Sequence, residues 1–238
     1  MGQTLRLGEV ELDVVQKDIK HVHLSVYPPN GRVRVSAPQH MSLDTIRVFV
    51  ISKLVWIKQE QRKLRSQERE TPREFLDRES HYVWGQRYLL EMLEREAAPQ
   101  VDLQPRALVL QVRPGANKAK RAEVLAHWYR EQIRQALPEL TAVWEPRLGV
   151  SVERFFVQHM KTKWGGCTPA TGTIRLNTEL AKKPRECLEY ILVHEMMHLL
   201  EPSHNDRFQR LMDQFMPMWR ERRVELNRAP LVHEEWGY

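Results

Sequence analysis

Hydrophobic and polar residues alternate along the first part of the chain, which is the pattern of β-strands with one buried face. Residues 22–26 and 33–35 alternate in this way on either side of the turn-forming residues 28–31, and this predicts a hairpin. Residues 81–92 predict two short strands about a glycine turn, and residues 108–112 predict one more. The first half of the chain is therefore expected to be rich in strands.

Apolar residues spaced three and four positions apart predict two long helices. The first begins after Ser42, a favourable capping residue, and runs to about residue 67. The second covers about residues 120–144, where Pro138 predicts a kink or a break. Further strands at 152–157 and 173–177 come before a helix that starts near Pro184.

This order of elements predicts an α+β fold. A soft boundary near residues 113–118 divides the chain into a strand-rich N-terminal lobe with one long helix, residues 1–117, and a C-terminal lobe, residues 118–238. One continuous domain is the alternative, since 238 residues suit either arrangement. The sequence contains no internal repeat and no glycine-rich phosphate loop.

Composition narrows the class of protein. Hydrophobic residues make up 42% and charged residues 29%, and no apolar run approaches the ~20 residues of a membrane span. The start lacks the basic and apolar regions of a secretory signal. Two cysteines, Cys167 and Cys187, are too few for a disulfide framework. We therefore expect a cytoplasmic protein without a membrane partner, whose cysteines are buried thiols.

The net charge of +6 permits an anionic partner. Basic residues alternate with acidic ones in the stretch 58–70, which favours a solvated helix face, and a nucleic-acid-binding patch is the alternative. Nothing in the sequence indicates the oligomeric state.

A metal-binding motif follows the apolar run 187–193. His194, Glu195 and His198 form an H-E-x-x-H pattern, which on a helix puts both histidines on one face and the glutamate within reach of a metal-bound water. Such a pattern also arises by chance in solvated helices, but the apolar surroundings disfavour this here, because unpaired buried charge is costly.

His204 is the expected third ligand, because catalytic zinc usually keeps three protein ligands and one open position. It lies beyond Pro202, which ends the helix. Ser203 and Asp206 resemble a capping box, so His204 is expected in the first turn of a new helix. The apolar stripe of that helix is Phe208, Leu211, Met212 and Phe215.

The segments 161–167, 174–177 and 194–204, with Phe208 and Pro217, resemble the YgjP-like zinc metallohydrolases, which are similar to SprT-like and other zincin peptidases. The resemblance covers nearly the whole chain and implies a zincin-like catalytic lobe. This sequence departs from the family at Gly166, where serine is usual, and at Gln209, where an aromatic residue often stands.

The first functional expectation is a zinc-dependent hydrolase, a peptidase acting on peptides or proteins. Zn²⁺ bound by the three histidines would lower the pKa of a water to ~7, and Glu195 would act as the general base. The family resemblance leaves two alternatives open. One is a zinc-dependent nucleoside triphosphate (UTP) pyrophosphatase, with Lys161, Lys163 and Arg175 binding phosphate. The other is a DNA-associated, SprT-like protein.

Four residues are candidates for substrate binding: Trp164, Gly165, Ile174 and Arg175. In zincins a strand just before the zinc helix pairs with an extended substrate, so the resemblance implies this role for residues 173–177. Glycines would permit close backbone approach. The alternative is a plain turn with Trp164 in the core. His159 and Arg175 are candidates for stabilising the oxyanion, and Glu201 for a hydrogen bond to a ligand histidine.

Overall fold

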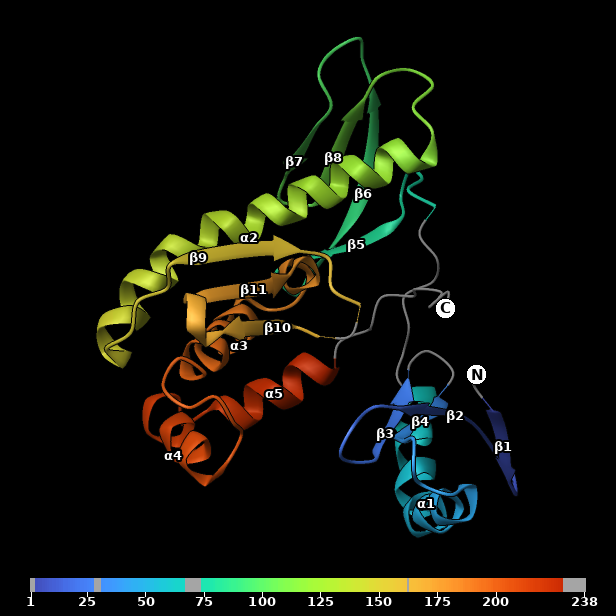
Figure 1. Cartoon of the computed structure of the whole chain (residues 1–238). Helices are drawn as coiled ribbons and strands as arrows, with labels where there is room; N and C mark the ends of the chain where they lie inside the picture. The colour runs from blue at the N-terminus through green and yellow to red at the C-terminus, as the bar shows by residue number, and fades with distance from the viewer. Residues whose placement is uncertain (1–2, 28–30, 67–73, 162, 229–238) are drawn as a thin grey trace. The chain divides into compact units, whose positions relative to one another are not determined.

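The computed structural model describes residues 3–27, 31–66, 74–161 and 163–228 (Figure 1). The described residues up to 66 form one compact unit, and those from 74 to 228 form a second. The chain has the mixed α+β fold that the sequence predicts.

The first unit consists of a four-stranded sheet and one helix. Its strands are β1 (Gln3–Leu7), β2 (Val10–Lys17), β3 (His23–Tyr27) and β4 (Arg32–Pro38), in the order β1-β2-β4-β3. The antiparallel pairing of β3 with β4 confirms the predicted hairpin strands, while residues 28–30 of its turn lie outside the described residues. Helix α1 (Leu43–Ser66) begins as predicted, since the Thr45 backbone N–H donates to Ser42 Oγ.

The second unit begins with a sheet of the same topology. Its strands are β5 (Ser80–Val83), β6 (Gln86–Glu94), β7 (Gln100–Leu103) and β8 (Ala107–Val112), in the order β5-β6-β8-β7. In both sheets two antiparallel hairpins join through a central parallel pair, and a helix follows. The sequence shows no repeat, because different residues produce the same alternation of buried and exposed positions.

Helix α2 (Lys118–Leu148) follows the second sheet and is longer than predicted. It continues through Pro138 and is closed by Gly149 in a left-handed conformation, whose N–H bonds the Glu145 carbonyl. Tertiary packing outweighs the loss of one helical hydrogen bond here, because residues on both sides of Pro138 are buried in the same core.

A three-stranded sheet and three helices complete the second unit. Strand β11 (Thr173–Asn177) lies between β10 (Gly165–Thr168) and β9 (Arg154–Gln158). Two short 3₁₀ helices, η1 (Pro169–Thr171) and η2 (Thr178–Lys182), flank β11. Helices α3 (Arg185–Met197), α4 (Asp206–Phe215) and α5 (Trp219–Arg228) follow. Among the described helices, none combines the length and apolar character needed to cross a membrane.

The two sheets of the second unit share one hydrophobic core with α2 and α3. Leu108 of β8, Ile133 of α2, Leu176 of β11 and Leu188 of α3 are fully buried in it. Residues 74–117 therefore pack with the C-terminal elements, and the separation between compact units falls between residues 66 and 74. The sequence-based boundary near residues 113–118 does not coincide with it, because a change of local pattern does not reveal which elements share a core.

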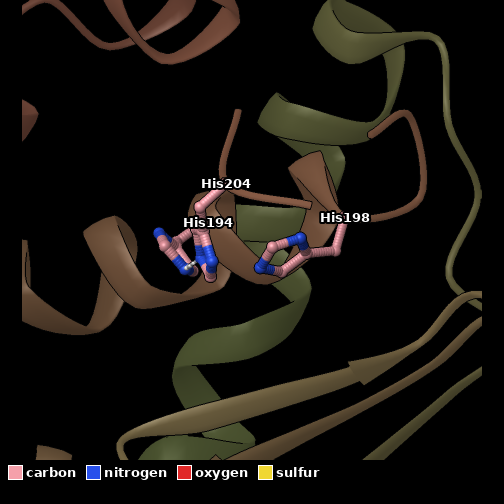
Figure 2. A group of neighbouring side chains, drawn as sticks. All are labelled: His194, His198 and His204. Carbon is pink, nitrogen blue, oxygen red and sulfur yellow. Dashed lines mark hydrogen bonds between the residues drawn. The ribbon is translucent and has the colours of Figure 1, made fainter. Parts of the chain in front are cut away.

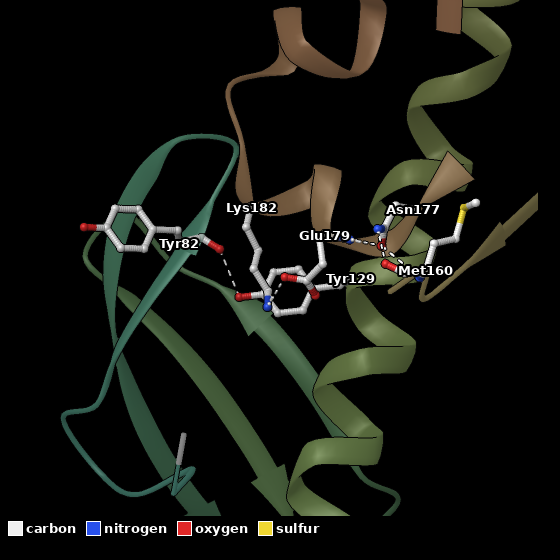
Figure 3. A network of polar contacts seen from close by, with 6 residues as sticks. All are labelled: Tyr82, Tyr129, Met160, Asn177, Glu179 and Lys182. Carbon is white, nitrogen blue, oxygen red and sulfur yellow. Dashed lines mark hydrogen bonds and ion pairs between the residues drawn. The ribbon is translucent and has the colours of Figure 1, made fainter. Parts of the chain in front are cut away.

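The β5–β6 turn is hydrogen-bonded to η2, which leads into α3. The Trp84 N–H donates to the Ala181 carbonyl at 2.8 Å, and the Gly85 N–H donates to the Lys182 carbonyl. Gly85 has a φ of +80°, and a Cβ there would lie 2.9 Å from Pro184 Cγ, so only glycine fits. Beside it, the Tyr129 hydroxyl of α2 donates to the Tyr82 carbonyl (Figure 3).

Candidate metal centre

Three imidazoles meet where α3 ends and the chain turns into α4 (Figure 2). His194 lies in the last turn of α3, His198 is its C-cap residue, and His204 lies before α4. Their potential ligand atoms all lie within 4.8 Å of one another. The structure therefore brings together the three histidines that the sequence proposes as a ligand set.

The ring nitrogens are arranged as a cation would require. The Nε2 atoms of His194 and His204 are 2.9 Å apart. His198 Nδ1 lies 3.1 Å from the Glu201 carbonyl oxygen, and donation to this oxygen leaves Nε2 with a free lone pair, as in many metal-bound histidines. Three imidazoles whose ring nitrogens converge in this way fit a zinc ion.

Partial loss of hydration favours the neutral form of two of these histidines. It lowers the pKa of His194 to about 3, with further lowering by the positive charges of His198, His204 and Arg223. Burial is also the largest cause that lowers the pKa of His204, and the positive charges of His198 and Arg223 lower it further. A neutral imidazole is the form that binds a metal ion, so neither ring would have to lose a proton to bind one near pH 7.

The turn that carries His204 is held by Glu201. The buried Glu201 carboxylate accepts hydrogen bonds from the Ser203 hydroxyl at 2.9 Å and the Ser203 N–H at 3.3 Å. Its backbone oxygen, rather than its side chain, contacts His198.

The predicted cap of α4 is wrong by two residues. Asn205, not Ser203, caps the helix by accepting the Phe208 N–H at 3.0 Å. His204 therefore precedes the helix instead of lying in its first turn, because Ser203 is engaged with Glu201 and Asn205 is the residue free to cap.

Phe208 holds all three imidazoles in place. Its ring centroid lies 5.0 Å from that of His194 and 4.8 Å from those of His198 and His204, and it stacks on His198. The side chain is 3% exposed and belongs to the predicted apolar face of α4. An apolar wall of this kind limits ring movement and excludes water from one side of the cluster.

Glu195 is a buried carboxylate next to this cluster. It is 6% exposed, and burial raises its pKa to about 7, against the lowering effect of the Lys163 charge. A carboxylate with a pKa near neutrality can both accept and return a proton. A Cβ at Gly165 would lie 2.6 Å from Glu195 Oε1, so β10 passes directly against this side chain.

Gly165 is the substrate-binding candidate that lies at the site. It belongs to β10, an edge strand of the three-stranded sheet within the described residues. Strand addition to residues 173–177 is contradicted, because β11 is the central strand and pairs with both β10 and β9. Ile174 is fully buried within it. The sequence pattern identifies a strand here but not its position within the sheet.

Arg175 lies on the other face of the sheet. It pairs with Gly166, whereas Gly165, which contacts Glu195, pairs with Leu176. Neighbouring residues of a strand point to opposite faces, so Arg175 points away from Glu195. Its guanidinium donates to Thr168 Oγ1 at 3.0 Å and lies 5.7 Å from the Phe156 ring centroid. Arg175 therefore belongs to neither an oxyanion site nor a phosphate site at the histidine cluster.

Trp164 and His159 were two other candidates. Trp164 packs against the hydrophobic core, and Lys183 Nζ lies 5.5 Å from its ring centroid. This position agrees with the alternative in which Trp164 is a core residue and does not bind substrate. The exposed His159 follows β9, which β11 separates from β10. Cys167 and Cys187 are free thiols, and burial raises the pKa of each to about 11.

The role of Asn177 was missed in the sequence. This residue, 4% exposed at the end of β11, accepts from the N–H groups of Met160 and Glu179, and donates to the carbonyls of Met160 and Lys163. Asparagine after a strand and before a helical segment is a capping signal, but its bonds to residues 160 and 163 depend on tertiary structure.

Among solved structures, the chain is similar to two metallopeptidase zymogens. Abylysin of Pyrococcus abyssi is 23% identical, with 40% of this chain and 98% of that one covered and a TM-score of 0.35. Jannalysin of Methanocaldococcus jannaschii is 22% identical, with 40% of this chain and 86% of that one covered and a TM-score of 0.32.

No curated protein matches the sequence. The model of the YgjP-like metallopeptidase domain, however, matches residues 20–229. This match includes the three histidines, Glu195 and β10, and the chain belongs to the YgjP-like metallopeptidase family.

Proposed function

We propose that this protein is a zinc-dependent peptidase in which His194, His198 and His204 hold the metal and Glu195 is the general base. The observation that carries the proposal is the convergence of the three imidazoles, with two Nε2 atoms 2.9 Å apart, beside a carboxylate that is 6% exposed. Family membership supports the same class of reaction.

When bound, zinc supplies Lewis-acid chemistry, since it lowers the pKa of a water to ~7 and polarises the substrate carbonyl. Glu195 takes a proton from the attacking water and delivers it to the nitrogen of the leaving amine. Its pKa, raised by burial to about 7, suits both steps. Glu201 and Phe208 keep the ligand rings in position through the turn and the aromatic wall.

We assign the binding of an extended peptide to β10. On the side away from β11, its backbone N–H and carbonyl groups have no strand partner among the described residues, and such an edge can accept another strand. Gly165 brings this edge against Glu195. A peptide paired with β10 therefore passes next to the proposed base.

The nucleotide alternative has less support. A phosphate site formed by Lys161, Lys163 and Arg175 loses Arg175, which lies on the opposite face of the sheet from Glu195. The described part of the chain offers no feature that favours a DNA-associated function over a peptidase.

The decisive experiment compares wild-type protein with Glu195→Gln. Each is loaded with one equivalent of zinc and incubated with a mixture of unstructured peptides, with UTP and with DNA. Wild type should cleave peptides, and Glu195→Gln should retain zinc but lose at least ~100-fold in rate, since a positioned general base contributes ~10²- to 10⁴-fold.

Glu186→Gln is the matched control, because Glu186 lies on the same helix and is exposed. It should retain wild-type activity. Hydrolysis of UTP without peptide cleavage, or full turnover by Glu195→Gln, would contradict the proposal.

A further inference from the structure

We propose that Lys163 selects substrates with a carboxylate on the C-terminal side of the cleaved bond. The inference rests on the proposed peptidase function and on β10 as the substrate-binding edge. It concerns which peptides bind, and it gives Lys163 a role in specificity rather than in the chemical step.

The backbone at Lys163 is fixed by a buried side chain. Asn177 Nδ2 donates to the Lys163 carbonyl at 2.8 Å and to the Met160 carbonyl at 2.7 Å (Figure 3 shows the contact with Met160). The Asn177 backbone N–H donates to the Trp164 carbonyl at 2.9 Å, which extends the β10–β11 pairing by one residue. Lys163 is thus held at the entrance to β10.

The ammonium group of Lys163 is available to a substrate. The side chain is exposed, and among the described residues no acidic group forms an ion pair with it. Its charge nevertheless reaches the site, since it acts on Glu195. Cys167, on the other side of Gly165 along the strand, also lies near enough to Glu195 to feel its charge. The Asn177 bond to Trp164 continues the β10–β11 pairing, and side chains alternate along a strand, so positions 163, 165 and 167 lie on one face. The contact of Gly165 with Glu195 shows that this is the face of the proposed base.

The direction of the substrate follows from strand geometry. β10 already pairs antiparallel with β11, and antiparallel pairing is the more stable arrangement per residue. In an antiparallel pair the substrate continues toward its C-terminus as the β10 numbering decreases. If the bond to be cleaved lies beside Gly165 and Glu195, Lys163 lies beside the leaving-group half of the peptide, about two residues from that bond.

A carboxylate is the group that Lys163 would recognise. An ammonium donates charge-assisted hydrogen bonds to carboxylates, and a carboxylate can come from an Asp or Glu side chain or from the free C-terminus of a short peptide. Both sources present the same chemistry at this position, and a peptide series can separate them.

The test uses zinc-loaded wild-type protein and quenched fluorescent peptides that differ only one to three residues after the cleaved bond. One pair compares Glu with Gln, and another compares a free with an amidated C-terminus. Wild type should favour the carboxylate in at least one pair by about fivefold in kcat/KM, the upper range for an exposed ion pair. Salt should reduce the preference.

Lys163→Met should bring the ratio of rates near one, and Lys163→Glu should shift the preference toward Lys at the same position. Lys161→Met is the matched control, because Lys161 is also exposed and lies two residues away, and it should keep the wild-type ratio. Equal rates for both members of each pair in wild type, or an unchanged preference in Lys163→Met, would overturn the inference while leaving the proposed peptidase intact.

A binding measurement keeps the inference testable without turnover. Fluorescein-labelled versions of the same peptides are titrated with zinc-loaded Glu195→Gln, with and without Lys163→Met. The ratio of Kd values for carboxylate and amide peptides should again be about fivefold and should fall near one in the double variant. If peptides bind with this ratio but are never cleaved, only the proposed function fails.

Discussion

Gly165→Ala tests the contact between β10 and Glu195. The added Cβ would lie 2.6 Å from Glu195 Oε1, 2.8 Å from Glu195 Cγ and 2.9 Å from Ile191 Cγ2. The closest of these falls 0.8 Å short of an ordinary contact of 3.4 Å. Because both partners belong to the buried helix α3, either the carboxylate or the strand has to move.

Two magnitudes follow from this overlap. Overpacking in a core costs about 1–3 kcal/mol, and each kcal/mol shifts the Tm of a chain of this size by about 2–4 °C. A displacement of about 1 Å at a catalytic group costs about 100-fold in rate. Gly165→Ala should therefore fold with a moderately lower Tm, retain zinc, and lose about 100-fold in peptide hydrolysis.

Gly166→Ala is the control for this variant. Gly166 is the next residue of the same strand, and a Cβ there would meet nothing within 4 Å. It should keep wild-type Tm and activity, and Gly166→Ser, which restores the residue usual in the family, should do the same. The assays are calorimetry, elemental analysis for zinc and hydrolysis of a quenched peptide. A fully active Gly165→Ala would refute the view that β10 fixes the position of the base.

Two further predictions concern the histidines. His204→Ala should weaken zinc binding by more than ~10- to 100-fold, which is the cost of losing a residue that only orients a ligand. Competition with a chelating dye measures the affinity, and His159→Ala is the control. Undiminished affinity in His204→Ala would mean that another group is the third ligand. The metal-free protein should lose stability to urea as pH falls below 6.5 toward 3, because the unfolded chain binds a proton that the half-buried His194 of the folded chain does not. His194→Phe should flatten this decline, and an equal decline in both proteins would contradict the prediction.

Local patterns were sufficient to predict most of the elements. Alternation at residues 33–35, helical spacing after Ser42 and the apolar stripe that includes Phe208 all correspond to observed elements. Each depends on neighbours within a few residues, and such local preferences survive in the folded protein. Strand β7 was missed because its four residues, although alternately polar and apolar, are too few to give a clear pattern and are mostly exposed.

The site was predicted only as far as spacing along one helix allows. His194 and His198 share a face of α3 by helical geometry, and Pro202 predicts the turn that returns His204 to them. The prediction of Ser203 as the cap was wrong, because Ser203 bonds Glu201 in the folded turn and Asn205 caps the helix instead.

The sequence by itself determined the proposed ligand set, the proposed base and the α+β character, because each rests on short-range spacing. The tertiary structure decided which strand is an edge, which face of the sheet meets Glu195, and that β5–β8 share a core with α3. These depend on pairings between segments distant in sequence. A strand has the same alternation in the middle of a sheet as at its edge. The sequence could therefore predict a strand at Thr173–Asn177, but neither its central position nor the position of β10 at the edge of the sheet.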